Sequence, residues 1–167
     1  MLAFNLRPAA VSVGPVLGDI SDGLRMSTAE TGILTSLPVL AFAVFGALAP
    51  RGARLVGLHR LTLLALLCVV GGLFGRGVTS SVPVFLVLSL LALAGMATAN
   101  VLLPSLVKLH FPDRIGLMTS VYSTALAIGL TSASVLTVPI SEAQDGWRSG
   151  LTVWALTACI AVLPGWP

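Results

Sequence analysis

Long stretches without a charged residue alternate with short polar segments along the whole chain. The apolar stretches must lie in lipid or against one another, because their side chains are not favourably solvated by water. A helix that crosses a bilayer needs about 20 residues, so the pattern predicts an all-α membrane protein. We expect six transmembrane helices in a single bundle, at about 1–18, 28–50, 60–79, 84–107, 115–139 and 148–166.

Two local signals mark helix boundaries. The tetrapeptide Ser80-Ser81-Val82-Pro83 is typical of a turn, so it separates the third predicted helix from the fourth. The segment Ser27-Thr28-Ala29-Glu30 has the pattern of a capping box, in which the first and last side chains satisfy each other's backbone amides. The second helix is therefore expected to start next to Ser27.

Composition excludes several classes of protein. Hydrophobic residues make up 56% of the chain and charged residues only 9%, whereas a soluble domain carries roughly a quarter charged residues. The 167 residues leave no room for a soluble catalytic domain beside the bundle. The basic residues are scattered rather than gathered in a stripe, which excludes nucleic acid as a partner. Both cysteines, Cys68 and Cys159, lie in apolar runs and are interpreted as buried packing residues.

Charge bias between alternate loops predicts the orientation. The loops after the second and fourth helices hold Arg51, Arg54, Arg60, Lys108 and Arg114 with one acid, Asp113. The other loops hold Asp19, Asp22, Glu30, Glu142 and Asp145 with Arg25, Arg76 and Arg148. Basic residues stay in the cytoplasm during insertion. We therefore expect the basic loops and both chain ends to be cytoplasmic, in a bacterial inner membrane.

The first predicted helix is short and contains a charge. Arg7 lies twelve residues before Asp19, or about 18 Å from the outer end of the helix, which is close to the bilayer centre. A guanidinium there could hold an anionic substrate. Alternatively, Arg7 reaches the cytoplasmic interface. The shortness is explained by a tilted helix or, the interpretation we favour, by a natural chain that begins further upstream.

Asparagine and proline occur together in the first and fourth helices. Pro8 and Pro104 lack the amide that would bond the carbonyl one turn earlier, so both are predicted to interrupt their helices. In transporters built from repeats, interrupted helices at corresponding positions mark the substrate site. Asn5 and Asn100 are therefore candidate binding residues. For Asn100, packing against a neighbouring helix is an equally good interpretation.

The fifth helix contributes one more candidate and a packing stripe. Tyr122 is the only tyrosine, and its hydroxyl needs a partner wherever it is buried. Ala125, Gly129 and Ala133 recur every four residues, which favours close helix packing.

No enzyme chemistry is expected. The predicted spans hold no deep Asp or Glu, and no residues are spaced as a nucleophilic or metal-binding set. We expect no catalytic residue, no metal and no cofactor.

Several segments together resemble a known family. Gly46-Ala47-Leu48-Ala49-Pro50-Arg51-Gly52-Ala53-Arg54 is similar to the cytoplasmic signature loop of the major facilitator superfamily, with Pro50 in place of the usual acid. The more specific segments are Asn5-Leu6-Arg7-Pro8, Asn100-Val101-Leu102-Leu103-Pro104, Phe111-Pro112-Asp113-Arg114 and Gly146-Trp147-Arg148. They resemble the cyanate and 2-nitroimidazole permease branch, over the whole length of the chain.

The resemblance implies a fold and a function. Such permeases have two six-helix halves with the substrate between them, and this chain resembles the amino-terminal half, a three-plus-three repeat. It implies a secondary transporter for a small anionic or polar solute such as cyanate. Arg7 and Asn100 would face the central cavity, and a second six-helix half would complete it. The alternatives are a non-catalytic membrane scaffold subunit and a half-transporter fragment without function.

Overall fold

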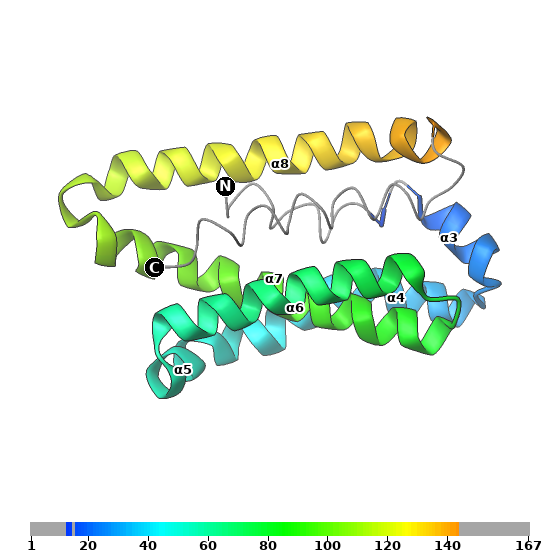
Figure 1. The fold of residues 1–167 in the computed structure, drawn as a ribbon, viewed down its shortest axis with the longest axis horizontal. Helices are drawn as coiled ribbons and strands as arrows, with labels where there is room; N and C mark the ends of the chain where they lie inside the picture. Colours follow the sequence, from blue (N-terminus) through cyan, green and yellow to red (C-terminus); the bar gives the residue numbers. More distant parts are fainter. Residues whose placement is uncertain (1–12, 15, 144–167) are drawn as a thin grey trace.

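The computed structural model describes residues 13–14 and 16–143, and every helix or turn of helix named below lies in that part (Figure 1). The residues outside the described part include Asn5, Arg7, Pro8 and Cys159, most of the first predicted helix and the whole of the sixth. The elements, in chain order, are α3 (Leu17–Leu24), α4 (Thr28–Ala41), the π-helical turn η1 (Phe42–Gly46), α5 (Ala47–Val56), α6 (Leu58–Val78), α7 (Val82–His110), the short 3₁₀ turn η2 (Pro112–Arg114) and α8 (Ile115–Ala143).

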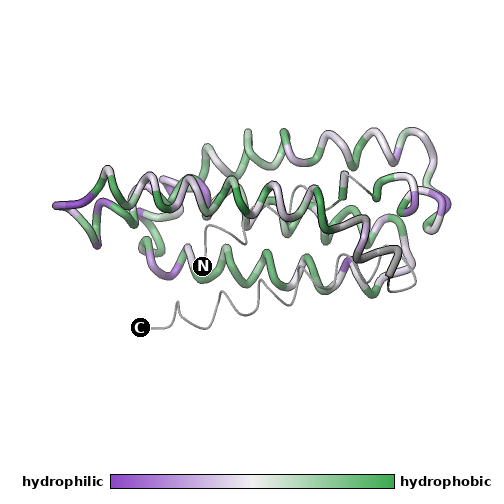
Figure 2. Tube along the Cα trace, turned by 90° about the horizontal axis from the view of Figure 1, so that it is seen from above, coloured by the Kyte–Doolittle hydropathy of each residue, from purple (hydrophilic) through white to green (hydrophobic). Residues whose placement is uncertain are grey.

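The described part of the chain is all-helical and strongly apolar. Four helical segments are long and apolar enough to cross a membrane by length and composition: Thr28–Val56, Leu58–Val78, Val82–His110 and Pro112–Leu136. In Figure 2 the hydrophobic residues follow the lengths of these helices, and hydrophilic residues gather where the chain turns.

The start of α4 confirms the capping box. The backbone N–H of Ser27 donates to Glu30 Oε2 at 2.7 Å, and the backbone N–H of Glu30 donates to Ser27 Oγ at 3.3 Å. These two bonds satisfy amides that the first turn of a helix cannot pair by itself. The boundary therefore follows from local chemistry alone.

The chain is helical beyond residue 18, where a loop was expected. Helix α3 continues to Leu24 because Ile20 and Leu24 lie four residues apart on one buried face, while Asp19 and Asp22 lie on the exposed side. The helix ends at Arg25, which adopts a left-handed conformation (φ 54°) and donates its N–H to the carbonyl of Asp22.

The segment that resembles a signature loop is helical, so the prediction of a loop at Gly46, Arg51 and Arg54 is corrected. Helix α5 covers this segment, and the chain turns only at Gly57, where φ is +94°. Pro50 cannot donate to the carbonyl of Gly46, and the wider π-helical turn that ends at Gly46 accommodates the missing bond. Both arginines are exposed on α5.

Helices α6 and α7 form the closest pair in the described bundle, antiparallel to each other (Figure 1). Glycine permits this approach at two points. A Cβ at Gly72 would lie 2.6 Å from the Leu88 carbonyl oxygen, and one at Gly95 would collide with the Ala65 carbonyl oxygen. Small residues at such crossings let backbones pack closely where lipid supplies no hydrophobic driving force.

The basic segments lie together at one end of the bundle. In Figure 1, α5, the start of α6, the end of α7 and η2 all lie at the left. Contact between the rings of His59 on α6 and His110 on α7, with centroids 5.6 Å apart, joins the two segments directly. The charge asymmetry seen along the sequence is thus an asymmetry between the two ends of the folded bundle.

Candidate functional site

Arg76 is the largest fully buried side chain in the described residues, with 0% of its surface exposed. It lies near the end of α6, two residues before Val78. It shares the buried face of that helix with Val69 and Leu73, at seven- and three-residue spacing. A charge inside an apolar bundle is costly and marks a candidate functional site.

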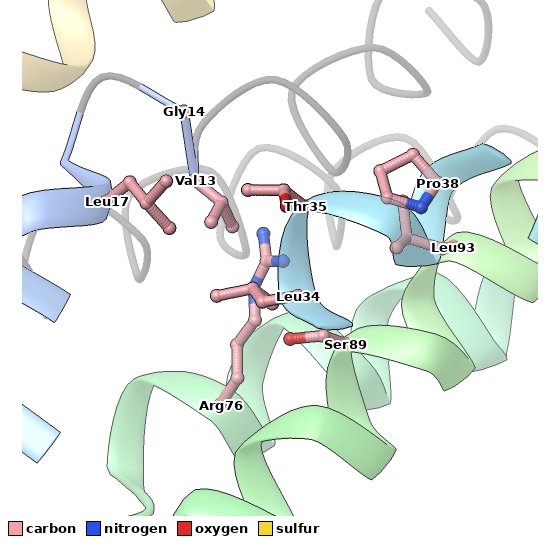
Figure 3. A pocket seen from close by; sticks show the side chains of 9 residues that line it. All are labelled: Val13, Gly14, Leu17, Leu34, Thr35, Pro38, Arg76, Ser89 and Leu93. Carbon is pink, nitrogen blue, oxygen red and sulfur yellow. The ribbon is translucent and has the colours of Figure 1, made fainter. Parts of the chain in front are cut away.

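The guanidinium lies beside a cavity of about 170 Å³ formed where four segments meet (Figure 3). The lining comprises Val13, Gly14 and Leu17 from the segment leading into α3, Leu34, Thr35 and Pro38 from α4, Arg76 from α6, and Ser89 and Leu93 from α7. In Figure 3 the guanidinium of Arg76 reaches up from α6 toward Val13 and Thr35. Apart from Arg76, Thr35 and Ser89, the described lining is apolar.

The two hydroxyl groups of the cavity differ in what they can offer a ligand. Ser89 is 1% exposed, and its Oγ has no hydrogen-bond partner within the described ranges. Thr35 Oγ1 donates to the Gly32 carbonyl at 2.9 Å, so its hydrogen is already in use. Together, Arg76 and Ser89 bring a cation and an available O–H donor to one apolar cavity, which suits an anionic or strongly polar ligand.

The structure places two of the predicted binding residues elsewhere. Asn100 is half-buried on α7, eleven residues beyond Ser89 and so about 16 Å further along the helix. Tyr122 is half-buried on α8, where it packs against the main apolar core. Neither lines the Arg76 cavity. Their proposed roles stay predictions, as do those of Asn5 and Arg7.

Helix α7 runs as one α-helix through Pro104, so this proline does not end the helical run. A proline inside a helix removes one hydrogen bond and crowds the preceding turn, and packing on both sides can keep the helix intact. Here α7 has buried residues on both sides of Asn100, among them Met96, Ala99 and Leu103. The helix thus continues across the missing amide of Pro104, and the role of Asn100 at this turn stays a prediction.

Arg76 itself was missed from the sequence, where it was counted as a loop charge. Two signals pointed to its burial. It falls inside the predicted span 60–79, and it continues the spacing of Val69 and Leu73. Removing Arg76 from the loop count makes the predicted outer side less basic, so the orientation predicted from charge is strengthened.

A candidate metal centre is not found in the described part of the chain, where no group of three or more His, Cys, Asp or Glu residues could hold an ion. The chemistry of the site rests on Arg76 and hydroxyl groups.

Known transporters are similar to this chain over nearly its whole length. An uncharacterized transporter of Bacillus subtilis, YycB, is 39% identical over 163 residues, which cover 97% of this chain and 40% of the relative. The 2-nitroimidazole transporter of Escherichia coli is 34% identical over 169 residues, 99% of this chain and 43% of the relative. The chain is therefore similar, over nearly its whole length, to part of known bacterial transporters. The cyanate transport protein CynX of Escherichia coli is 29% identical over 165 residues, 97% of this chain and 42% of the relative.

The chain spans less than half the length of the curated relatives that it matches. No family profile matches it. The relatives that the chain matches are named as transporters and not as enzymes, which supports a role without covalent chemistry.

Proposed function

We propose that this chain is part of a major-facilitator-type secondary transporter that moves a small anionic or polar solute, such as cyanate or a related compound, by alternating access. The observation that carries the proposal is its similarity, over 97–99% of its length, to transporters that include a cyanate transport protein. Four apolar helices and a buried guanidinium beside a cavity support it. Fixed positive charge inside a dry bundle favours an anion over a cation.

The proposed unit is one six-helix half of a twelve-helix transporter, with predicted helices at about 1–18, 28–50, 60–79, 84–107, 115–139 and 148–166. The match to only about 40% of each relative supports a second half as partner. Within this half we assign substrate contacts to Asn5, Arg7, Asn100 and Tyr122. The guanidinium of Arg7 would pair with the solute, while the amides and the phenol would complete its hydrogen bonds.

The proposed location is the bacterial inner membrane, with both ends of the chain in the cytoplasm. The gathering of basic residues at the end formed by α5, His59 and His110 supports this orientation.

Single-cysteine labelling tests the orientation. In a variant without Cys68 and Cys159, we expect an impermeant maleimide added outside intact cells to label Gly23→Cys, at an exposed position of α3, and not Leu55→Cys. Leu55 is 86% exposed on α5 and is preferred to Gly57, whose φ of +94° would strain a cysteine. Labelling after cell lysis is the control for reactivity. External labelling of Leu55→Cys without Gly23→Cys would reverse the orientation.

Uptake by the transporter at its full natural length tests the function. In proteoliposomes we expect saturable uptake of radiolabelled cyanate, competed by other small anions, above that of liposomes without protein. Gluconate, a carboxylate several times larger than cyanate, should not compete. Uptake equal to that of empty liposomes for cyanate and for the small anions would overturn the proposal and favour a scaffold role.

A further inference from the structure

We infer that the Arg76 cavity is a separate binding site for one small monovalent anion, held by the guanidinium of Arg76 and the hydroxyl of Ser89. Nothing in the similarity to transporters assigns a site here. The inference goes beyond the proposed transport and does not depend on it, because binding at this cavity can be measured at equilibrium without any gradient.

Size limits the ligand to a few heavy atoms. The cavity measures about 170 Å³, and an engineered cavity of about 150 Å³ in another protein is large enough for benzene. An anion of three to six heavy atoms therefore fits, and a sugar acid does not. The described lining comes from α4, α6, α7 and the start of α3 with the residues just before it, all of which belong to this chain.

Charge limits the ligand to a single negative charge. Arg76 is the only ionisable residue in the described lining, so this lining carries one unit of positive charge. A guanidinium presents five N–H donors in a planar fork, so it can hold a carboxylate-like anion and keep other contacts of its own. A dianion would bring a second, unpaired charge into apolar surroundings, which is strongly unfavourable.

The buried hydroxyl provides the second contact. A buried O–H that lacks a partner is destabilising, and an anion that accepts from it removes this penalty. Ser89 lies on the side of the cavity formed by α7 and Arg76 on the side formed by α6 (Figure 3). An anion between them would accept from both, while the apolar side chains of Leu34 and Leu93 exclude water.

Formate is the probe that tests the site. It is small, planar and singly charged, and gluconate provides a carboxylate of the same charge that is too large. We propose to measure binding of ¹³C-formate to the full-length protein in nanodiscs by NMR titration, at constant ionic strength made up with gluconate. The expected result is saturable formate binding that Ser89→Ala weakens about tenfold, the loss of one hydrogen bond to a charged group. Arg76→Lys should weaken formate binding further, because an ammonium cannot form the bidentate pair of hydrogen bonds that a guanidinium forms with a carboxylate.

A control variant and a stability measurement separate binding from folding. Ser36→Ala removes an exposed hydroxyl that bonds the Gly32 carbonyl on α4, away from the cavity lining, and should change formate affinity less than twofold. In gluconate alone, Ser89→Ala should unfold no earlier than the wild type, because it removes a buried donor without a described partner. This variant therefore tests the site even if Arg76→Lys does not fold.

Two results would overturn the inference. The first is that the wild type shows no saturable binding at millimolar formate in 100-fold excess over the protein. The second is that Ser89→Ala and the wild type bind formate with equal affinity. Formate binding retained in a protein that shows no uptake would contradict the proposed transport and leave this site standing.

Discussion

Replacing Gly95 by alanine is expected to destabilise the bundle by about 3 kcal/mol or more, the upper range for forcing extra atoms into a packed interior. A methyl group there would collide with the carbonyl oxygen of Ala65 and lie 3.0 Å from the Cβ of Cys68. Backbone cannot yield as a flexible side chain can, so α6 and α7 would have to separate. Thermal unfolding of the detergent-solubilised protein measures the loss.

Gly71→Ala is the matched control on the partner helix. A Cβ at Gly71 meets nothing within 4 Å, so the same substitution should be neutral or raise stability by up to about 1 kcal/mol through helix propensity. Gly72→Ala, one residue further, should behave like Gly95→Ala, because its methyl group would meet the Leu88 carbonyl oxygen. Equal unfolding temperatures for Gly71→Ala and Gly95→Ala would show that α6 and α7 do not cross as closely as described.

The second large effect is expected at Arg7 and rests on the proposed function. In the full-length transporter, Arg7→Ala should reduce uptake at least 100-fold, because it removes the charge that pairs with the anion. Arg7→Lys should recover only a small part, since a point ammonium cannot reproduce the planar fork. Initial rates of radiolabelled cyanate uptake, at matched protein density, measure both.

Lys108→Ala is the control for removing a basic residue. Lys108 is exposed near the end of α7, in the basic group at that end of the bundle. Its substitution by alanine should therefore keep the uptake rate within about twofold of the wild-type rate. Unchanged uptake in Arg7→Ala would return Arg7 to the alternative interpretation, an arginine that reaches the cytoplasmic interface.

Several features of this protein followed from local sequence. Apolar runs of about 20 residues can only be helices in a bilayer, because no water is present to bond an unpaired backbone. The described residues are accordingly all-helical, with four segments apolar enough to cross a membrane. Ser27 and Glu30 close the start of α4 by bonds within four residues, so no distant part of the chain was needed to predict that boundary.

Other features were decided by contacts between residues far apart in the chain. The sequence by itself determined that the chain is helical and apolar, because lipid imposes helices on any long apolar run. Only the tertiary structure decided that Arg76 is buried, that the segment around Arg51 is helix and that α6 and α7 cross at their glycines. In a membrane both lipid and neighbouring helices are apolar, so hydropathy does not tell which face of a helix meets a partner. That choice depends on shape and on where buried polar groups converge, and both arise only when the helices pack.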